Sequence, residues 1–212
     1  MNNFKLNKIF SIIITFYPNH FFFENIIKAH KNLFSDIILV NNSPEISLDS
    51  FKSPQVTIIN NPSNIGLAAA LNIGILEAKK QGAEMVALFD QDTLLPDDFS
   101  QNMLKYINTH SRDKKAALFS PIYFNKVTDN YGSLINFKLL RLIRSKPDKQ
   151  KLFTYPKYVI TSGSFISIDA LDDIGLMREE LFIDFVDIEW CLGARRLGFE
   201  VVTINKVVID HH

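Results

Sequence analysis

The sequence has almost no cysteine and no hydrophobic run long enough to cross a membrane, and each absence narrows the class of protein. Cys191 is the only cysteine in 212 residues, so no disulfide can form within the chain, which is typical of a reducing cytoplasmic setting. The apolar run at residues 9–16 is too short to span a bilayer, and no small-residue cleavage site follows it. We therefore expect a soluble protein or one that is peripheral to a membrane.

An excess of charge is also lacking, because 23 basic residues balance 23 acidic ones. Nothing in this balance attracts nucleic acid, and we expect no nucleic-acid partner. Hydrophobic residues make up 47% of the chain and charged residues 22%, which is typical of a globular protein, and 18 phenylalanines predict a Phe-rich core. The length suits one α/β core, so we expect a single domain over residues 1–212.

Short apolar strands alternate with helical patterns along the chain, which predicts an α/β fold with a mostly parallel central sheet flanked by helices. The expected strands are residues 9–15, 36–40, 56–59, 85–89, 116–119, 159–168, 201–204 and 207–209. The expected helices are residues 22–33, 66–80, one opened by Pro96, 169–174 ended by Gly175, and 186–197. Residues 125–156 are basic and show little periodicity, which indicates a long surface connection or a loop that covers an active site.

Polar clusters follow three of the predicted strands, at residues 41–42, 60–64 and 90–92. Ligands of parallel α/β sheets bind beyond the carboxyl ends of the strands, so these clusters predict a ligand site. Asp90 and Asp92, two residues apart in a loop, can converge on one divalent cation, and carboxylate oxygens suit Mg²⁺ or Mn²⁺. The alternative is a polar loop with two solvated acids.

Six short segments in a fixed order resemble the family 2 glycosyltransferases, and within them rhamnosyltransferase-like members. In chain order they are residues 13–17 (IITFY), 39–43 (LVNNS), 64–74 (NIGLAAALNIG), 90–92 (DQD), 161–164 (TSGS) and 182–191 (FIDFVDIEWC). The resemblance runs from about residue 9 to the C-terminus. It implies the GT-A fold, a nucleoside diphosphate sugar as donor, and inversion at the anomeric carbon.

The resemblance also implies a role for several acidic residues. Asp90 and Asp92 would hold the metal, with Asp90 near the ribose or the metal, and Asp187 would be the general base for the acceptor hydroxyl. Burial among aromatic side chains would raise the pKa of Asp187 and make it a better base. The alternative for Asp187 is a cap of the following helix, and Asp184 and Glu189 are nearby rivals.

Candidate nucleotide-binding residues come from the strand ends. Thr15 and Tyr17 are expected to line the base pocket, Tyr17 by stacking, unless they only terminate the strand. Asn41 stands where the family usually has an Asp that contacts the nucleotide, so base or ribose recognition is expected to use the Asn amide or to differ.

Three further candidates depend on close approach of the backbone. Asn64 and Gly66 are expected to approach the nucleotide, because Gly permits close backbone contact. The alternative for both is the start of a helix, with Asn64 as its cap. Gly163 is expected to allow close approach of the donor, or else to mark a bulge in a strand.

The chain departs from the family pattern at two further places. Gly193 stands where relatives often have Arg, so Arg195 or Arg196 would have to help hold the diphosphate. Family members usually extend well beyond this length, so the resemblance leads us to expect a truncated or a short member. His211 lies near where a metal- or phosphate-contacting His can occur in relatives.

The resulting functional prediction is transfer of a sugar, with rhamnose from dTDP-rhamnose as the family-level expectation, to a growing bacterial surface polysaccharide. A saccharide or lipid-linked acceptor is expected, and the basic residues 138–151 suggest peripheral contact with the inner membrane. Two other functions stay open, a nucleotidyltransferase and a catalytically silent nucleotide-sugar-binding module. Trp190 and Cys191 are expected in the core, and the imidazoles of His20, His30 and His110 on the surface.

Overall fold

A computed structural model describes residues 8–110, 115–126, 128–138 and 141–210. Its strands are β1 (Ile9–Thr15), β2 (Asp36–Asn41), β3 (Val56–Asn60), β4 (Met85–Asp90), β5 (Ala116–Asn125), β6 (Asn130–Tyr131), β7 (Leu134–Lys138), β8 (Arg141–Ser145), β9 (Phe153–Thr154), β10 (Ser164–Ser167) and β11 (Glu200–Asp210). Its α-helices are α1 (His20–Leu33), α2 (Leu67–Lys80), α3 (Phe99–Ile107), α4 (Ile168–Ile174) and α5 (Val186–Arg196).

One nine-stranded sheet runs through the described residues in the order β3-β2-β1-β4-β10-β5-β11-β9, with β6 beside β5. The first four strands of this order pair in parallel, as their alternation with helices predicts. Every residue of β1 is buried, because both faces of the sheet are covered. The parallel half therefore carries the ends of β1, β2 and β4 to the same edge of the sheet.

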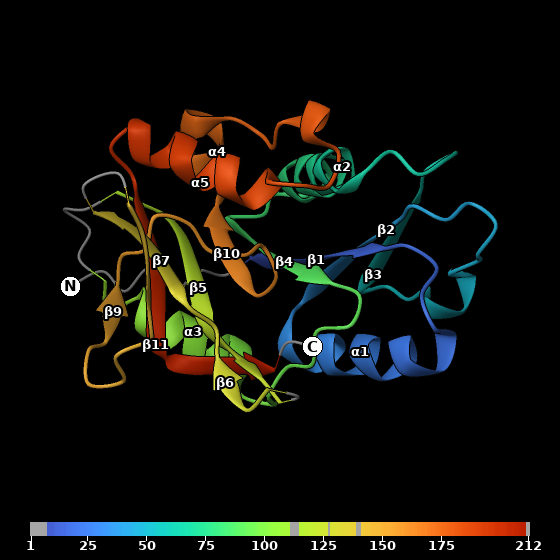
Figure 1. The fold of residues 1–212 in the computed structure, drawn as a ribbon. Helices are drawn as coiled ribbons and strands as arrows, with labels where there is room; N and C mark the ends of the chain where they lie inside the picture. The colour runs from blue at the N-terminus through green and yellow to red at the C-terminus, as the bar shows by residue number, and fades with distance from the viewer. Residues whose placement is uncertain (1–7, 111–114, 127, 139–140, 211–212) are drawn as a thin grey trace.

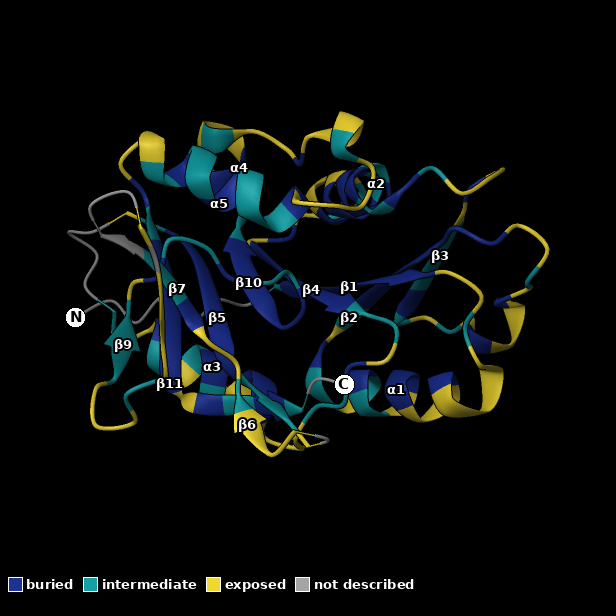
Figure 2. Ribbon diagram, viewed as in Figure 1, coloured by how far each residue is buried: buried dark blue, intermediate teal, exposed yellow. Residues whose placement is uncertain are grey.

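Helices α2, α4 and α5 cover one face of the sheet, and α1 and α3 cover the other (Figure 1). Each layer buries its own hydrophobic core against the sheet, so the central strands are buried on both sides (Figure 2). The core beneath α1 and α3 is rich in phenylalanine, as the composition predicts, with Phe23, Phe89, Phe99 and Phe165 each at most 1% exposed. Trp190 and Cys191 lie in the opposite core, which confirms their expected burial.

The second half of the sheet is mixed rather than parallel. Strand β10 pairs antiparallel with both β4 and β5, while β11 runs parallel to β5. The two last strands expected from sequence are one strand, β11, whose register against β5 shifts between Thr203 and Val208. The strand expected at 159–168 is also shorter, because residues 161–164 form a turn whose last residue, Ser164, begins β10.

The prediction of an irregular connection over residues 125–156 is wrong for much of its length. Strands β7 and β8 pair as an antiparallel hairpin, β6 pairs with the end of β5, and β9 pairs with β11. The charged residues spread through this stretch conceal its short strands in the sequence.

Helices α1 and α3 begin at other residues than the sequence predicts. The side chain of Asn19 accepts a hydrogen bond from the amide of Phe22 at 3.2 Å, so α1 begins earlier than expected. Helix α3 begins at Phe99 rather than at Pro96.

Two of the three histidines expected at the surface lie in the interior. His30 is fully buried, and burial lowers its pKa to about 3. The side chain of His110 is 5% exposed.

Candidate active site at the ends of β1, β2 and β4

A groove of about 330 Å³ lies at the carboxyl ends of the parallel strands, where the sequence predicts a ligand site. It is lined by residues from five segments: Ile14, Phe16, Asn42, Asn64, Gly66, Leu67, Asp90, Gln91, Asp92, Phe182 and Ile183. Four of the predicted site residues, Asn64, Gly66, Asp90 and Asp92, are therefore brought together. Among the described residues, no Lys, Arg or His lines this groove.

The loop that carries Asp90 and Asp92 is fixed by hydrogen bonds on both sides. The amide of Thr93 donates to the carbonyl of Asp90 at 3.4 Å, which closes a turn around the two carboxylates. The hydroxyl of Ser162 accepts from the amide of Asp90 at 3.1 Å and lies 2.6 Å from the hydroxyl of Thr93. The loop therefore holds both acids in the groove without using their carboxylates as structural acceptors in these bonds.

Gln91, between the two acids, links this loop to the end of β1. Its side-chain oxygen accepts from the amide of Phe16 at 2.8 Å, and its side-chain nitrogen donates to the carbonyl of Phe16 at 3.0 Å. The sequence analysis did not single out Gln91, although its position inside the acidic motif is the signal that marks it. This pair of bonds sets where Phe16 lies relative to the carboxylates.

The α2 motif at residues 64–74 has structural tasks at its glycines and asparagines. Gly66 has φ +85°, and a Cβ there would lie 2.6 Å from the ring of Phe182. The amide of Ala68 donates to the carbonyl of Phe182 at 3.1 Å. The start of α2 is thus packed directly against the segment that precedes α5.

Asn72 forms a second connection between α2 and the same segment. Its side-chain oxygen accepts from the amide of Met177 at 2.9 Å, and its side-chain nitrogen donates to the Met177 carbonyl at 2.8 Å and to a Glu179 carboxylate oxygen at 2.9 Å. Because Asn72 is only 3% exposed, these bonds are protected from water. The helix that borders the groove therefore anchors residues 177–182 at two places.

The segment that leads into α5 is strained. Phe182 has φ 58° and ψ −71°, and the amide of Ile183 donates to the carbonyl of Leu181 at 2.7 Å, which is a γ-turn of the rare positive-φ form. Phe185 has φ 64° in the left-handed region. Phe182, Ile183 and Phe185 are 47%, 60% and 67% exposed. Strained backbone with exposed apolar side chains is typical of a functional loop.

Asp187 lies in the first turn of α5 and is half-buried. Burial raises the pKa of its carboxyl, while the amide of Ile188, which donates to Oδ1 at 2.7 Å, acts in the opposite direction. The side chain lines a void of about 10 Å³, enough for about one water, together with Thr161, Ser164 and Trp190. Asp187 is therefore not among the residues that line the groove.

Tyr123 links the two acidic positions. Burial raises the pKa of its phenol well above the ordinary value, and the carboxylates of Asp90 and Asp187 raise it further. Asp187 lines its small void together with Leu88 of β4, two residues before Asp90, so both acids lie near the end of β4. The phenol stays protonated and donates to the backbone carbonyl of Ser162, with the carbonyl of Ile160 at 3.2 Å.

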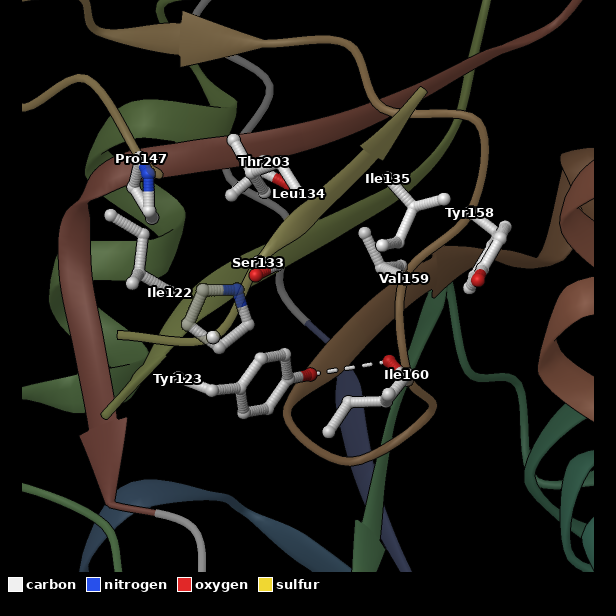
Figure 3. A pocket seen from close by; sticks show the side chains of 12 residues that line it. Ile122, Tyr123, Ser133, Leu134, Ile135, Pro147, Tyr158, Val159, Ile160 and Thr203 are labelled. Carbon is white, nitrogen blue, oxygen red and sulfur yellow. Dashed lines mark hydrogen bonds between the residues drawn. The ribbon is translucent and has the colours of Figure 1, made fainter. Parts of the chain in front are cut away.

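Tyr123 also forms one wall of a second, mostly apolar cavity of about 270 Å³, in which its hydroxyl points toward the Ile160 carbonyl (Figure 3). This cavity lies beneath β7 and shares no lining residue with the groove. Ser162 binds the Asp90 amide and receives the Tyr123 bond at its own carbonyl. Tyr123 therefore supports the acidic loop indirectly, through the backbone of residues 160–162.

Three other predicted site residues lie at strand ends but do not line the groove. Thr15 and Asn41 are fully buried, and Asn41 donates to the carbonyl of Ile46 at 2.8 Å and to the side chain of Asn60 at 3.0 Å. An Asp could make neither bond, because an ionised carboxylate has no donor. Tyr17 is 55% exposed, and its ring contacts that of Phe16 edge-on at 4.7 Å.

Gly163 has a structural reason for lacking a side chain. The amide of Ser164 donates to the carbonyl of Thr161 at 3.0 Å, and Gly163 occupies the third position of this turn with φ +76°. A Cβ there would lie 2.7 Å from Ile209 and 3.0 Å from Pro121. The close approach at Gly163 is therefore to the protein's own side chains.

Comparison with known proteins agrees with this geometry. The model of the family described as glycosyl transferase family 2 matches residues 11–175. The chain belongs to glycosyl transferase family 2. It is 28% identical over 209 residues to the dTDP-rhamnosyl transferase RfbF of Shigella flexneri, covering 97% of this chain and 69% of that protein. The resemblance to rhamnosyltransferase-like members of the family is thereby confirmed.

Solved structures show the fold. Over 98% of this family 2 chain, GalNAc-T7 with UDP, GalNAc and Mn²⁺ superposes with a TM-score of 0.77 at 14% identity. S. aureus TarS 1–349 in complex with UDP-GlcNAc gives 0.69 at 12% identity over 96%. The chain spans 44% and 58% of those two solved chains. The expected α/β GT-A fold is confirmed.

The family resemblance does not carry over to every position of this chain. Arg195 and Arg196, expected to replace an Arg missing at Gly193, line a separate depression and not the groove. A Cβ at Gly193 would meet only Arg196, at 3.9 Å, so packing does not require Gly there. His211 lies outside the described residues.

No group of three or more His, Cys, Asp or Glu side chains that would hold a metal occurs among the described residues. Of the described residues that line the groove, Asp90 and Asp92 are the two that offer carboxylate oxygens. Mg²⁺ is commonly held by one or two carboxylates together with substrate phosphates and water, so two acids fit such an ion when a phosphorylated ligand is present.

Proposed function

We propose that the protein is an inverting glycosyltransferase that moves a sugar from a nucleoside diphosphate donor to an acceptor hydroxyl. The donor is dTDP-rhamnose, in keeping with the similarity to a dTDP-rhamnosyl transferase. The acceptor is a growing bacterial surface polysaccharide, free or lipid-linked, at the cytoplasmic side of the membrane. No helix in the described part of the chain is long and apolar enough to cross a bilayer.

One observation carries the proposal: the described residues that line the groove include two carboxylates and no basic side chain, at the end of β4. A diphosphate placed beside two carboxylates is repelled unless a cation lies between them. Asp92 and Asp90 would hold Mg²⁺ or Mn²⁺, which would supply the positive charge that a leaving diphosphate needs. Gly66 and Leu67 bring the positive end of the α2 dipole to the same groove, which favours an anion further.

The nucleotide is held by groove residues on either side of these acids. Phe16, fixed by Gln91, offers an aromatic face for the base, with Tyr17 at its edge. Asn64 borders the groove next to Gly66. Thr15 and Asn41 contribute behind the pocket, by fixing the loops from which these side chains project. The groove volume lies at the lower end of the roughly 300–1,000 Å³ typical of small-molecule sites.

Asp187 acts as the general base. As the acceptor oxygen forms its bond to the anomeric carbon, the bond from that carbon to the diphosphate oxygen breaks. The acceptor proton passes to a carboxylate oxygen of Asp187. The raised pKa of Asp187 improves its match to this task, and a positioned base contributes roughly 10²–10⁴-fold in rate.

A thermal-shift panel of dTDP, UDP and GDP and their sugars, with and without Mn²⁺, tests the donor site. A ligand at 100 times its Kd stabilises the folded state by about 2.7 kcal/mol, which is roughly 5–10 °C for a chain of this size. A shift that requires Mn²⁺ and is lost in Asp92→Asn supports the proposal. The proposal is contradicted if no ligand of the panel raises the melting temperature, or if the shift is unchanged in Asp92→Asn. Donor binding without transfer to any acceptor extract favours a silent binding module.

A further inference from the structure

A second hollow, on the outer side of α5, has a charge opposite to that of the donor groove. It has a volume of about 720 Å³ and is lined by Lys157, Arg178, Glu189, Leu192, Arg195 and Arg196. Four of these six side chains are cationic and one is anionic, whereas the whole chain is neutral. It shares no residue with the groove that holds Asp90 and Asp92. We call it the basic depression.

The cations of the basic depression are weakly neutralised by their neighbours. Arg178 lies 3.6 Å from a Glu180 carboxylate and Arg196 lies 3.9 Å from Glu189, in pairs whose arginines are 61% and 76% exposed. Exposed pairs at such distances contribute roughly 0–1 kcal/mol, so these arginines remain available to a ligand. Within the described residues, no ion pair joins Lys157 or Arg195 to a carboxylate.

Arg195 is held in place, which distinguishes the basic depression from a scatter of surface charges. Its Nη1 donates to the carbonyl of Pro156 at 3.1 Å, and the residue is half-buried. This bond ties the chain just before Lys157 to the last turn of α5. The remaining guanidinium N–H groups are therefore presented from a fixed position, and such a fork matches phosphate oxygens.

We propose that the basic depression binds a phosphate or diphosphate group carried by the acceptor. The assignment to the acceptor rests on the proposed glycosyl transfer, since Asp187 begins the same helix whose later turns form the depression. The excess of three positive charges matches a diphosphate group. The hollow is larger than that group alone, so the phosphate arrives as part of a larger molecule, such as a phosphorylated saccharide or a lipid headgroup.

Binding of inorganic pyrophosphate, measured by calorimetry in EDTA, tests the site without any metal or donor. The double variant Lys157→Gln/Arg196→Gln leaves Arg195 and its bond to Pro156 in place. We expect it to weaken pyrophosphate binding by roughly tenfold for each cation removed. The matched control Lys28→Gln/Lys105→Gln removes two exposed lysines from α1 and α3, on the other side of the sheet, and should bind as the unaltered protein does.

Co-sedimentation with vesicles identifies the source of the phosphate. If binding to phosphatidylglycerol vesicles, and not to phosphatidylcholine vesicles, falls in the double variant, the ligand is a lipid headgroup. If only pyrophosphate binding falls, the ligand is a soluble phosphorylated acceptor. Equal pyrophosphate binding by the double variant and the control overturns the proposal. The donor-induced thermal shift is measured on the same variants, so a failure of the donor site is seen separately.

Discussion

Replacing Asp187 by Asn removes one charge from the first turn of α5 and preserves the local hydrogen bond. The Asn side-chain oxygen can accept from the amide of Ile188 as Asp187 does at 2.7 Å. The change therefore tests the base without removing this hydrogen bond; the N-cap of α5 is Phe185 and is not altered. We expect transfer to fall by roughly 10²–10⁴-fold, which is about 3–5 kcal/mol in activation free energy, while donor binding stays unchanged.

The activity of Asp187→Asn should fall, but its thermal stability should stay the same or rise. A carboxyl whose pKa is raised in the folded state holds its proton more tightly when folded, so the free energy of unfolding decreases as the pH rises above the unfolded-state pKa. At pH 7 that penalty is fully present for Asp187 and absent for Asn. We expect the melting temperature of Asp187→Asn to equal or exceed that of the unaltered protein at pH 7, with the difference vanishing below about pH 4.

The assay is release of nucleoside diphosphate and formation of glycosylated product, followed as a function of pH. The acidic limb of kcat/KM should lie above the ordinary Asp pKa of about 3.9, because activity is lost as Asp187 takes up a proton. Asp184→Asn, which neutralises an exposed acid three residues away, is the control and should retain activity. Full transfer by Asp187→Asn would refute the reasoning, and loss of transfer only in Asp184→Asn would move the role to that residue.

Three other substitutions test the support around the groove. Gly66→Ala should destabilise the fold by about 1–3 kcal/mol in chemical denaturation, because its φ is +85° and its Cβ would lie 2.6 Å from the ring of Phe182; an unchanged midpoint would show that the contact is unimportant. Tyr123→Phe should cost about 1–3 kcal/mol, because the carbonyl of Ser162 loses a buried donor, and no loss in the same measurement would contradict that account. Asp92→Asn should abolish Mn²⁺-dependent donor binding and leave the melting temperature of the ligand-free protein nearly unchanged, since its side chain is exposed; calorimetry with and without Mn²⁺ checks this.

The parallel half of the fold could be predicted from sequence because its signals are local. Strand β1 is rich in β-branched residues, and its predicted bounds, residues 9–15, match the structure. The hairpin β7–β8 was missed because cationic residues interrupt its alternation, and residues 161–164 were placed in a strand although Gly163 belongs to a turn. Register and pairing in this half depend on contacts between segments far apart in the chain.

The acidic centre was predictable where its signals are local and not where they depend on distant segments. Asp90 and Asp92 follow directly from a strand end and line the groove, whereas the tasks of Gln91 and Tyr123 depend on partners 75 and 39 residues away in sequence. For Asn41, the position at a strand end suggested a ligand contact that the structure does not show. Its side chain instead donates hydrogen bonds to the carbonyl of Ile46 and to the side chain of Asn60. A sequence motif locates the site better than it assigns each side chain within it.

The α2 motif connects donor binding to the position of the base in this chain. Gly66 borders the groove and also lies against Phe182. Further along α2, the side chain of Asn72 accepts a hydrogen bond from the amide of Met177. A ligand that displaced the start of α2 would therefore move the strained segment that leads into α5, the helix that carries the proposed base. The positive φ angles at Phe182 and Phe185 persist because these anchors hold the segment, and the same anchors set where Asp187 lies relative to the donor groove.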